Sequence, residues 1–354
     1  MLGIQSSSAP SASSAPTAPS SAGERFLTEL LASADIRING DRPWDLRIHN
    51  PAFFRRVMAQ GTLGLGESYM DGWWDCDRLD IAFDKAMSAQ LEMKLKFNWP
   101  LALDLAKARL FNRQTKALSK TVAEQHYNLG NDFYADMLDP FMQYTCAYWK
   151  RNGDAGKGAS TLAEAQENKL DLVCRKLGLK PGMTVLELGC GWGGFARFAA
   201  ERYGAHVTAY NISSEQVAYG RERTKGLPVD IRLQDYREAE GTYDRIVSIG
   251  MCEHVGYRNY RTFFKTLHDR LKDGGLALVH TIGGLKSVTS IEPWLGKYIF
   301  PHAMLPSVAQ LSRAMEGLFV VEDWHNFGPD YDLTLMAWLE NFERNWAKHR
   351  AAYG

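Results

Sequence analysis

The sequence predicts an α/β fold with a Rossmann-like parallel sheet, preceded by a mainly helical N-terminal region. Two observations lead to this fold class. From Pro181 onward, short apolar runs with strand character alternate with runs that have helical spacing, and such alternation is typical of a parallel sheet with helices on both faces. A glycine-rich turn also follows the first of these strands, at the position where doubly wound folds bind their ligands.

Five runs in this part of the chain are predicted to be strands. They are Thr184–Leu188, His206–Asn211, Val229–Leu233, Tyr243–Ile249 and residues 276–282, with residues 318–324 as a candidate sixth strand. Helices are predicted between them, including Gly194–Tyr203 and residues 214–225.

The region before the sheet is predicted to contain a disordered tail and a helical domain. Residues 6–22 are almost entirely Ser, Ala, Pro and Thr, and such a segment cannot bury enough apolar surface to fold. We therefore expect a disordered tail over residues 1–23, a mainly helical domain over residues 24–121 and the α/β domain over residues 122–354. Within the helical domain, residues 25–31 have helical spacing, residues 61–66 are predicted to be a loop, and Asp71-Gly72 marks a turn.

Composition excludes several classes of protein. Lysine and arginine number 41, and aspartate and glutamate also number 41, so no global positive field favours nucleic acid. The five cysteines are scattered, without CxxC pairs or metal-ligand spacing, which is typical of a reduced, intracellular protein with no metal site. No apolar run is long enough to span a bilayer, and no signal-peptide pattern is present. We expect a cytoplasmic protein.

Residues 94–120 form a basic stretch that could bind a membrane surface. Seven lysines and arginines stand against one acid, Asp104, and aromatic residues and leucines are interleaved with them. A basic amphipathic segment of this kind is attracted to anionic lipid. The same pattern also suits a solvated helix that links two domains, and the sequence leaves both interpretations open.

The glycine turn is the first candidate binding site. Gly189, Gly191 and Gly193 follow the strand Thr184–Leu188, and glycines let the backbone turn tightly and approach a ligand closely. The spacing from Gly189 through Gly191 to Gly194 also fits a dinucleotide-binding fingerprint, which by itself is a weak signal.

Residues around the turn favour S-adenosylmethionine (SAM) over a dinucleotide. Glu187 lies two residues before the first glycine, where a methyltransferase places an acid that faces the amino-acid end of the cofactor. Asn211 ends the second strand, where a dinucleotide site normally has an acidic residue for a ribose hydroxyl. Asp235 and Tyr236 follow the third strand and are placed to contact the edge or face of an adenine.

Several motifs together carry a resemblance to a known family. They are residues 64–74, 124–134, 142–149, the glycine turn, and residues 253–256, 279–283, 298–301, 322–328 and 331–335. On these motifs the chain, from about residue 32 to residue 346, resembles the cyclopropane fatty acyl phospholipid synthases and the related mycolic acid cyclopropane synthases. The resemblance implies a class I SAM methyltransferase sheet over residues 122–354 and a lipid-interacting helical domain before it.

The resemblance also implies a reaction, a cofactor set and a site. Enzymes of this family add the SAM methyl carbon across a cis double bond of an acyl chain. A carbocation-like species then loses a proton to bound bicarbonate and closes to a cyclopropane ring. By resemblance, bicarbonate is held by Cys146, Glu253, His280, the backbone of Ile282, and Tyr331. Since an ionised Glu253 would repel bicarbonate, we expect the two to share a proton. The resemblance also implies a set of SAM-binding residues, namely Tyr144, Thr145, Gly189, Gly191, Gly193, Asn211, Gln216 and Tyr236. The two acids noted above, Glu187 and Asp235, bring the predicted SAM-binding residues to ten.

The resemblance implies unsaturated phospholipids as partners and a peripheral location at the inner face of the membrane. It implies no nucleic acid partner. A homodimer is left open. Each proposed bicarbonate ligand also has an ordinary structural interpretation: Cys146 as a small buried hydrophobe, His280 as a core histidine, Glu253 in a local pair and Tyr331 in packing. Their joint match to one family site favours function. His126 and His302 are weaker candidates.

Two other functions remain open, and the sequence departs from the family pattern at two points. A methyl-branching relative would share the carbocation and resolve it differently, and a SAM- or lipid-binding protein without catalysis would use the same pocket.

Asn211 stands where the family commonly has threonine, and it can still form hydrogen bonds. The family chain continues beyond residue 354 with a helix and a strand that inserts into the sheet, so we expect this last strand to be absent and an inner sheet edge to be exposed.

Overall fold

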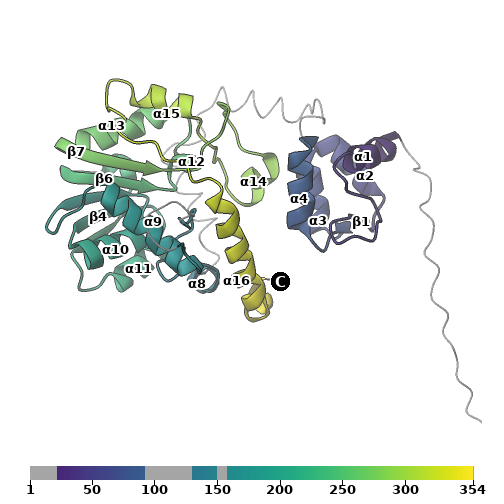
Figure 1. Ribbon diagram of the computed structural model, residues 1–354, viewed down its shortest axis with the longest axis horizontal. Coiled ribbons are helices and arrows are strands. Elements are labelled where there is room, and N and C mark those ends of the chain that lie inside the picture. The colour runs from purple at the N-terminus through teal and green to yellow at the C-terminus, as the bar shows by residue number, and fades with distance from the viewer. Residues whose placement is uncertain (1–21, 92–129, 150–157, 354) are drawn as a thin grey trace, which may run out of the picture. The chain divides into compact units, whose positions relative to one another are not determined.

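The computed structural model describes residues 22–91, 130–149 and 158–353 (Figure 1). These residues belong to two compact units, of which the smaller comprises residues 22–91 and 292–294 and the larger comprises the others. The predicted tail lies outside the described residues except for Ala22 and Gly23, which open the first helix. The basic stretch of residues 94–120, His126 and the predicted domain boundary at residues 121–122 also lie outside them.

The smaller unit is mainly helical. Its elements are the helices α1 (Ala22–Ala32), α2 (Ala52–Gln60), α3 (Thr62–Met70) and α4 (Leu79–Ser88), and the antiparallel pair β1 (Arg47–Ile48) and β2 (Trp74–Asp75). A core that includes Leu27, Phe53 and Trp74 joins them. The predicted helix over residues 25–31 and the turn at residues 71–72 are confirmed.

The predicted loop over residues 61–66 is wrong, because α3 begins at Thr62. Gly61 makes the break between α2 and α3 by itself, with a backbone φ of 61°. Gly64 lies inside α3 against the preceding helix, where a Cβ atom would come within 2.5 Å of the carbonyl oxygen of Arg56. The glycines therefore allow close helix packing here, and packing overrides their low helix propensity.

The larger unit contains a five-stranded parallel sheet, which confirms the predicted fold class. The strands are β3 (Thr184–Leu188), β4 (His206–Asn211), β5 (Val229–Leu233), β6 (Tyr243–Ile249) and β7 (Leu271–His280), in the order β5-β4-β3-β6-β7. Successive residues of β3 face opposite sides, since Val185 belongs to one core cluster and Leu186 to another. Among the described residues, β7 pairs with β6 alone and so forms one edge.

Helices cover both faces of this sheet (Figure 1). One core layer is built with α9 (Leu162–Lys176) and α10 (Gly194–Tyr203), and the other with α13 (Tyr260–Arg270) and α15 (Val308–Met315). The further elements are α8 (Asn131–Met137), α11 (Ser214–Arg223), the 3-10 turn η1 (Tyr236–Glu238), α12 (Cys252–Val255), α14 (Pro293–Tyr298) and α16 (Asp330–Tyr353). Within the described ranges, none of the helices is both long and apolar enough to cross a membrane.

Four of the predicted strands agree with the structure at both ends, and the fifth does not. β7 spans Leu271–His280 in place of residues 276–282. It ends early because the backbone N–H of Ile282 donates to the Glu253 side chain (Ile282 N to Glu253 Oε1, 2.8 Å) instead of to a neighbouring strand. Residues 318–324 form no strand, and Val320 there is 88% exposed. The predicted helix over residues 214–225 ends at Arg223.

Candidate active site

The glycine turn connects β3 to α10 and has a backbone that only glycine adopts readily. Gly189, Gly191 and Gly193 have φ angles of 80°, 53° and 77°, in the left-handed region. A Cβ atom on Gly189 would also lie 2.9 Å from the Sδ atom of Met251. The backbone of the turn is thereby left open to a ligand at the carboxyl ends of the strands.

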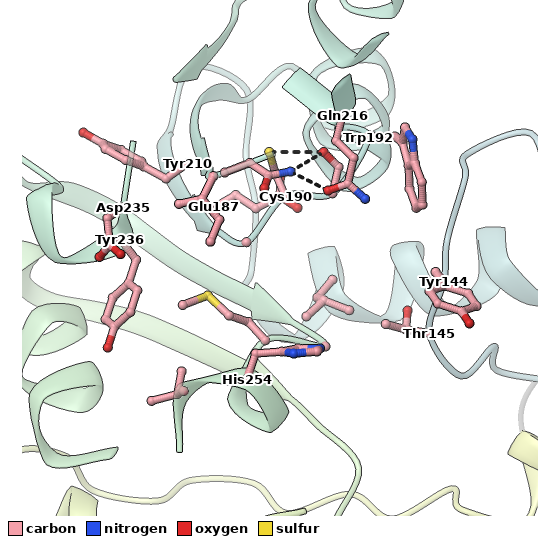
Figure 2. A pocket seen from close by; sticks show the side chains of 18 of the residues that line it. Tyr144, Thr145, Glu187, Cys190, Trp192, Tyr210, Gln216, Asp235, Tyr236 and His254 are labelled. Atoms are coloured by element: carbon pink, nitrogen blue, oxygen red, sulfur yellow. Dashed lines mark hydrogen bonds between the residues drawn. The ribbon is translucent and has the colours of Figure 1, made fainter. Parts of the chain in front are cut away.

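A pocket lies at this edge of the sheet, and nine of the ten predicted SAM-binding residues line it. Figure 2 shows Asp235 and Tyr236 at one end of the pocket, Tyr144 and Thr145 at the other, and Glu187 between them. Gly193 does not line the pocket; it lies at the start of α10. The nine lining residues are Tyr144, Thr145, Glu187, Gly189, Gly191, Asn211, Gln216, Asp235 and Tyr236.

Asn211 holds the wall of the pocket together. Its Nδ2 atom donates to the carbonyl oxygen of Gly191 (2.9 Å) and to Oε1 of Gln216 (2.8 Å), and its Oδ1 atom accepts from the N–H of Ser213 (3.1 Å). One side chain thus links the glycine turn to the start of α11. An asparagine at the end of β4 can therefore replace the threonine that is common in the family.

Glu187 places a buried carboxyl group in the pocket. The residue is 3% exposed, and its Oε2 atom has no hydrogen-bond partner among the described residues. Burial raises the pKa of Glu187 to about 8, against the nearby charge of Lys169, which lowers it. A buried carboxyl oxygen without a partner is costly, so this atom is suited to a cationic group of a ligand.

Asp235 is already partly engaged within the protein. Its carboxylate accepts from Nε and Nη2 of Arg237, each at 2.6 Å, and from the backbone N–H of Arg237. This bidentate pair fixes the direction of Asp235 at the pocket end. Tyr236 packs edge-on against Phe263, with ring centroids 5.7 Å apart.

Glu253 and Ile282 meet directly. Glu253 lies at the start of α12, and its Oε1 atom accepts the hydrogen bond from the Ile282 backbone noted above. The Oε2 atom of Glu253 is buried and has no hydrogen-bond partner in the described part of the chain. Burial raises the pKa of this carboxyl group, so its protonated form is favoured.

His280 is the last residue of β7 and presents a second buried polar atom. Its Nδ1 atom has no hydrogen-bond partner within the described residues. The ring stacks on Phe327, with centroids 5.4 Å apart and planes 20° apart. Burial lowers the pKa of His280 to about 3, so its imidazole is neutral at physiological pH.

The first turn of α16 positions Cys146 and Tyr331. Thr334 accepts through Oγ1 from the N–H of Ala147 (3.1 Å), and Asp330 accepts from the N–H of Trp149 (2.8 Å). These bonds fix the segment that follows Cys146 beside the helix that carries Tyr331. Burial raises the pKa of Cys146 to about 11 and raises the pKa of Tyr331 as well, with further contributions from the charges of Glu253, Tyr144 and Cys146.

Interactions connect four of the five proposed bicarbonate ligands, and the fifth, His280, lies two residues before Ile282 in the chain. None of the five lines the pocket. Glu253 and Ile282 are joined by a hydrogen bond, and the Tyr331 hydroxyl lies within electrostatic range of Glu253 and Cys146. Thr145, which lines the pocket, immediately precedes Cys146 in the chain.

Comparison with known proteins identifies the family. A family profile described as mycolic acid cyclopropane synthetase matches residues 113–354. The chain belongs to this cyclopropane synthase family. It is 52% identical over 322 residues to the cyclopropane-fatty-acyl-phospholipid synthase of Escherichia coli (strain K12), covering 91% of this chain and 82% of that one. It is also 33% identical to the tuberculostearic acid methyltransferase UfaA1 of Mycobacterium tuberculosis, over 84% of this chain and 72% of that one.

Solved structures of the cyclopropane synthase family share the fold. The cyclopropane synthase MmaA2 from Mycobacterium tuberculosis superposes with a TM-score of 0.61 at 30% identity, over 68% of this chain and 88% of that one. The mycolic acid cyclopropane synthase CmaA1, solved with S-adenosylhomocysteine (SAH) and CTAB, gives 0.59 at 31% identity, over 66% and 86%. As a member of this family, the chain is a SAM-dependent methyltransferase.

Sequence reasoning missed several residues that line the cyclopropane synthase pocket. Trp192 follows the glycine turn directly and donates through Nε1 to Oδ1 of Asn131 (2.7 Å). His254 also lines the pocket. His302, which the sequence offered as a weaker candidate, lines it too and has a left-handed φ of 62°, a strained conformation for histidine. Position next to the glycine turn could have indicated Trp192, but nothing in the sequence indicates a strained backbone at His302.

We expect SAM binding at pH 7 to release less than one proton per site, because proton loss from Glu187 is partly offset by proton uptake at Lys169, whose pKa Glu187 raises. Glu187, with its pKa raised to about 8, is mostly protonated in the free protein, and the ammonium group of SAM against it would favour the ionised form. The pKa of Glu187 is 4.5 when the side chain is exposed in the unfolded chain and about 8 in the folded protein. The carboxyl group therefore stabilises the fold fully below pH 4.5, and this stabilisation is lost as the pH rises through about 8. Calorimetric titration with SAH in buffers of different ionisation enthalpy measures the released protons.

The release should shrink above pH 8, where the free protein is already ionised, and it should vanish in Glu187→Gln. Equal proton release by the wild type and Glu187→Gln would show that the ammonium group does not bind at this carboxyl group.

Proposed function

We propose that this protein transfers the methyl carbon of SAM to the cis double bond of unsaturated phospholipid acyl chains and leaves a cyclopropane ring. The observation that carries the proposal is a pair of buried polar atoms without hydrogen-bond partners among the described residues, Oε2 of Glu253 and Nδ1 of His280. His280 pairs across the sheet with Ile249, which lines the SAM pocket. The relative with 52% identity is named for this activity.

The pocket supports SAM as the methyl donor. Its end at Asp235 and Tyr236 offers a carboxylate and an aromatic ring, which suit an adenosine group, and Glu187 offers an acceptor for the amino-acid group. Methyl transfer breaks the bond from sulfur to the methyl group and forms a bond from that carbon to the alkene. Ring closure then requires the loss of a proton from the transferred carbon.

The polar cluster fits a small anion such as bicarbonate. Two atoms of the proposed anion ligands, Oε2 of Glu253 and Nδ1 of His280, are buried and have no hydrogen-bond partner among the described residues. When Glu253 is protonated, its carboxyl group can donate a hydrogen bond and the imidazole nitrogen can accept one. Cys146, Glu253, His280, the Ile282 backbone and Tyr331 would hold the anion. When bound, bicarbonate would supply the base for the proton lost at ring closure.

Burial keeps these ligands in the protonation states that an anion requires. The raised pKa values leave the thiol of Cys146 and the hydroxyl of Tyr331 neutral at pH 7, so both can donate hydrogen bonds. Glu253 can share a proton with the anion because its own pKa is raised. The cluster thus adds no net negative charge that would repel bicarbonate.

Aromatic side chains form a wall beside the donor pocket. Tyr144 packs against Trp338 with centroids 5.1 Å apart, and Tyr331 packs against the same indole at 6.1 Å. Phe300 lies 6.4 Å from Tyr144. Aromatic faces can stabilise positive charge on an acyl chain without reacting with it, and the same apolar wall excludes water.

We also propose that the protein works at the inner surface of the membrane. The support is the basic sequence of residues 94–120, in which leucines and three aromatic residues are interleaved with the lysines and arginines. Such a sequence suits anionic lipid.

The test is incubation of the purified protein with SAM, bicarbonate and vesicles of monounsaturated phospholipid. We expect the lipids to gain the mass of one CH₂ group, with upfield cyclopropane protons in the NMR spectrum of the product. Folded protein that binds SAM and yields no mass gain with bicarbonate present would contradict the proposal. A mass gain with a branching methyl or methylene signal in place of the upfield protons would assign the methyl-branching reaction instead.

A further inference from the structure

Lys169 is a buried lysine that links the donor pocket to the anion cluster. It lies on α9, is 1% exposed, and is among the largest fully buried side chains. Its ammonium group donates to Oε1 of Gln143 and to Oγ1 of Thr145, each at 2.7 Å. Both acceptors are neutral and both line the pocket. A buried ammonium group with only neutral acceptors is costly to the fold, which indicates a role in the site.

The same face of α9 carries a second, uncharged contact to this loop. Gln166, one turn before Lys169, donates through Nε2 to the carbonyl oxygens of Thr145 (2.8 Å) and Gln143 (3.3 Å). The hydrogen bonds of Gln166 already fasten the loop backbone. The feature that Lys169 adds is therefore its positive charge.

The charge of Lys169 acts on groups of both sites. It interacts with Glu187 in the donor pocket and with Cys146 and His280 in the anion cluster. Burial lowers the pKa of Lys169 to about 7, so an anion bound nearby would favour the charged form. The other charged group that acts on it is Asp139, whose carboxylate accepts from the N–H groups of Phe141 and Gln143.

We propose that Lys169 is a positioning residue of the transfer reaction, whose ammonium group fixes the Gln143–Thr145 loop and supplies the positive charge that makes the neighbouring cluster bind bicarbonate. The inference rests on the proposed function, because it assumes that the cluster of Cys146, Glu253, His280 and Tyr331 takes this anion. Opposite charges in a buried site attract strongly, so the loss of this charge should weaken anion binding more than it weakens SAM binding.

The test compares Lys169→Met with the matched control Gln166→Met, which removes loop hydrogen bonds from the same helix face without removing a charge. Bicarbonate labelled with ¹³C is titrated against SAH-loaded protein, and its dissociation constant is followed by ¹³C NMR line broadening. We expect Lys169→Met to raise this constant about tenfold and Gln166→Met to change it less than about twofold, while both variants weaken SAH binding to a similar degree. Lys169→Arg should restore most of the bicarbonate affinity.

Equal bicarbonate affinities for Lys169→Met and Gln166→Met would overturn the inference. If Lys169→Met does not fold, as judged by its melting curve, Lys169→Gln carries the same comparison. A wild type that binds no bicarbonate but still forms cyclopropane product also overturns the role of Lys169, and methylene transfer then stands. A folded wild type that forms no product in the vesicle assay rejects the proposed function itself, whatever the bicarbonate titration gives.

Discussion

Replacement of Glu253 by glutamine is expected to lower kcat for cyclopropane formation by about 10²–10⁴-fold, the usual contribution of proton-transfer groups. Glutamine keeps the volume of the side chain, and its carbonyl oxygen can still accept from the Ile282 backbone at the position of the present 2.8 Å bond. It cannot share a proton with a bound anion. The defect should therefore lie in the chemistry, and the affinity for SAM should change less than about twofold.

The assay is product formation on monounsaturated vesicles at saturating SAM, with SAH affinity measured on the same preparation. Glu343→Gln is a suitable control, because Glu343 is an exposed residue on α16 and its amide variant should keep wild-type activity. If Glu253→Gln retains more than about a tenth of the wild-type kcat, the buried carboxyl group has no part in proton transfer.

Replacement of Gly194 by alanine is expected to destabilise the larger unit by about 3 kcal/mol or more, at the upper end of the usual cost of overpacking. A Cβ atom at this first residue of α10 would lie 1.9 Å from the carbonyl oxygen of Phe141 and 2.4 Å from Nε2 of Gln143. The nearest neighbour is backbone, which cannot rotate away. The loop that carries Tyr144 and Thr145 would have to move, and SAM affinity should fall with stability.

Thermal unfolding followed by circular dichroism measures this effect, and we expect a fall in Tm of about 6–12 °C. Gly283→Ala is the matched control for stability, because a Cβ atom there meets no heavy atom within 4 Å and the change should stay within about 1 kcal/mol. A Tm of Gly194→Ala within about 2 °C of the wild type would mean that the loop does not pack on α10 as described.

The sheet could be predicted from sequence because its strands are short apolar runs separated by amphipathic helices. The ends of β3 to β6 follow from this pattern alone. The end of β7 could not be predicted, because the Ile282 N–H group leaves the ladder for a carboxylate 29 residues earlier in the chain. The prediction of a loop at residues 61–66 was wrong for a similar reason, because Gly64 allows α3 to pack closely against α2.

The sequence by itself determined the fold class and the glycine turn, and it supplied the candidate residues of the site, because each is a local pattern of residue types. Tertiary structure alone decided which polar atoms lack partners. The Oε2 atoms of Glu187 and Glu253 are notable only because no neighbouring donor reaches them within the described residues. It also decided that Lys169 is fully buried and that its ammonium group donates hydrogen bonds to two residues that line the pocket. Burial and the distances between segments far apart in the chain set the energy of a charge, and neither can be read from residue order.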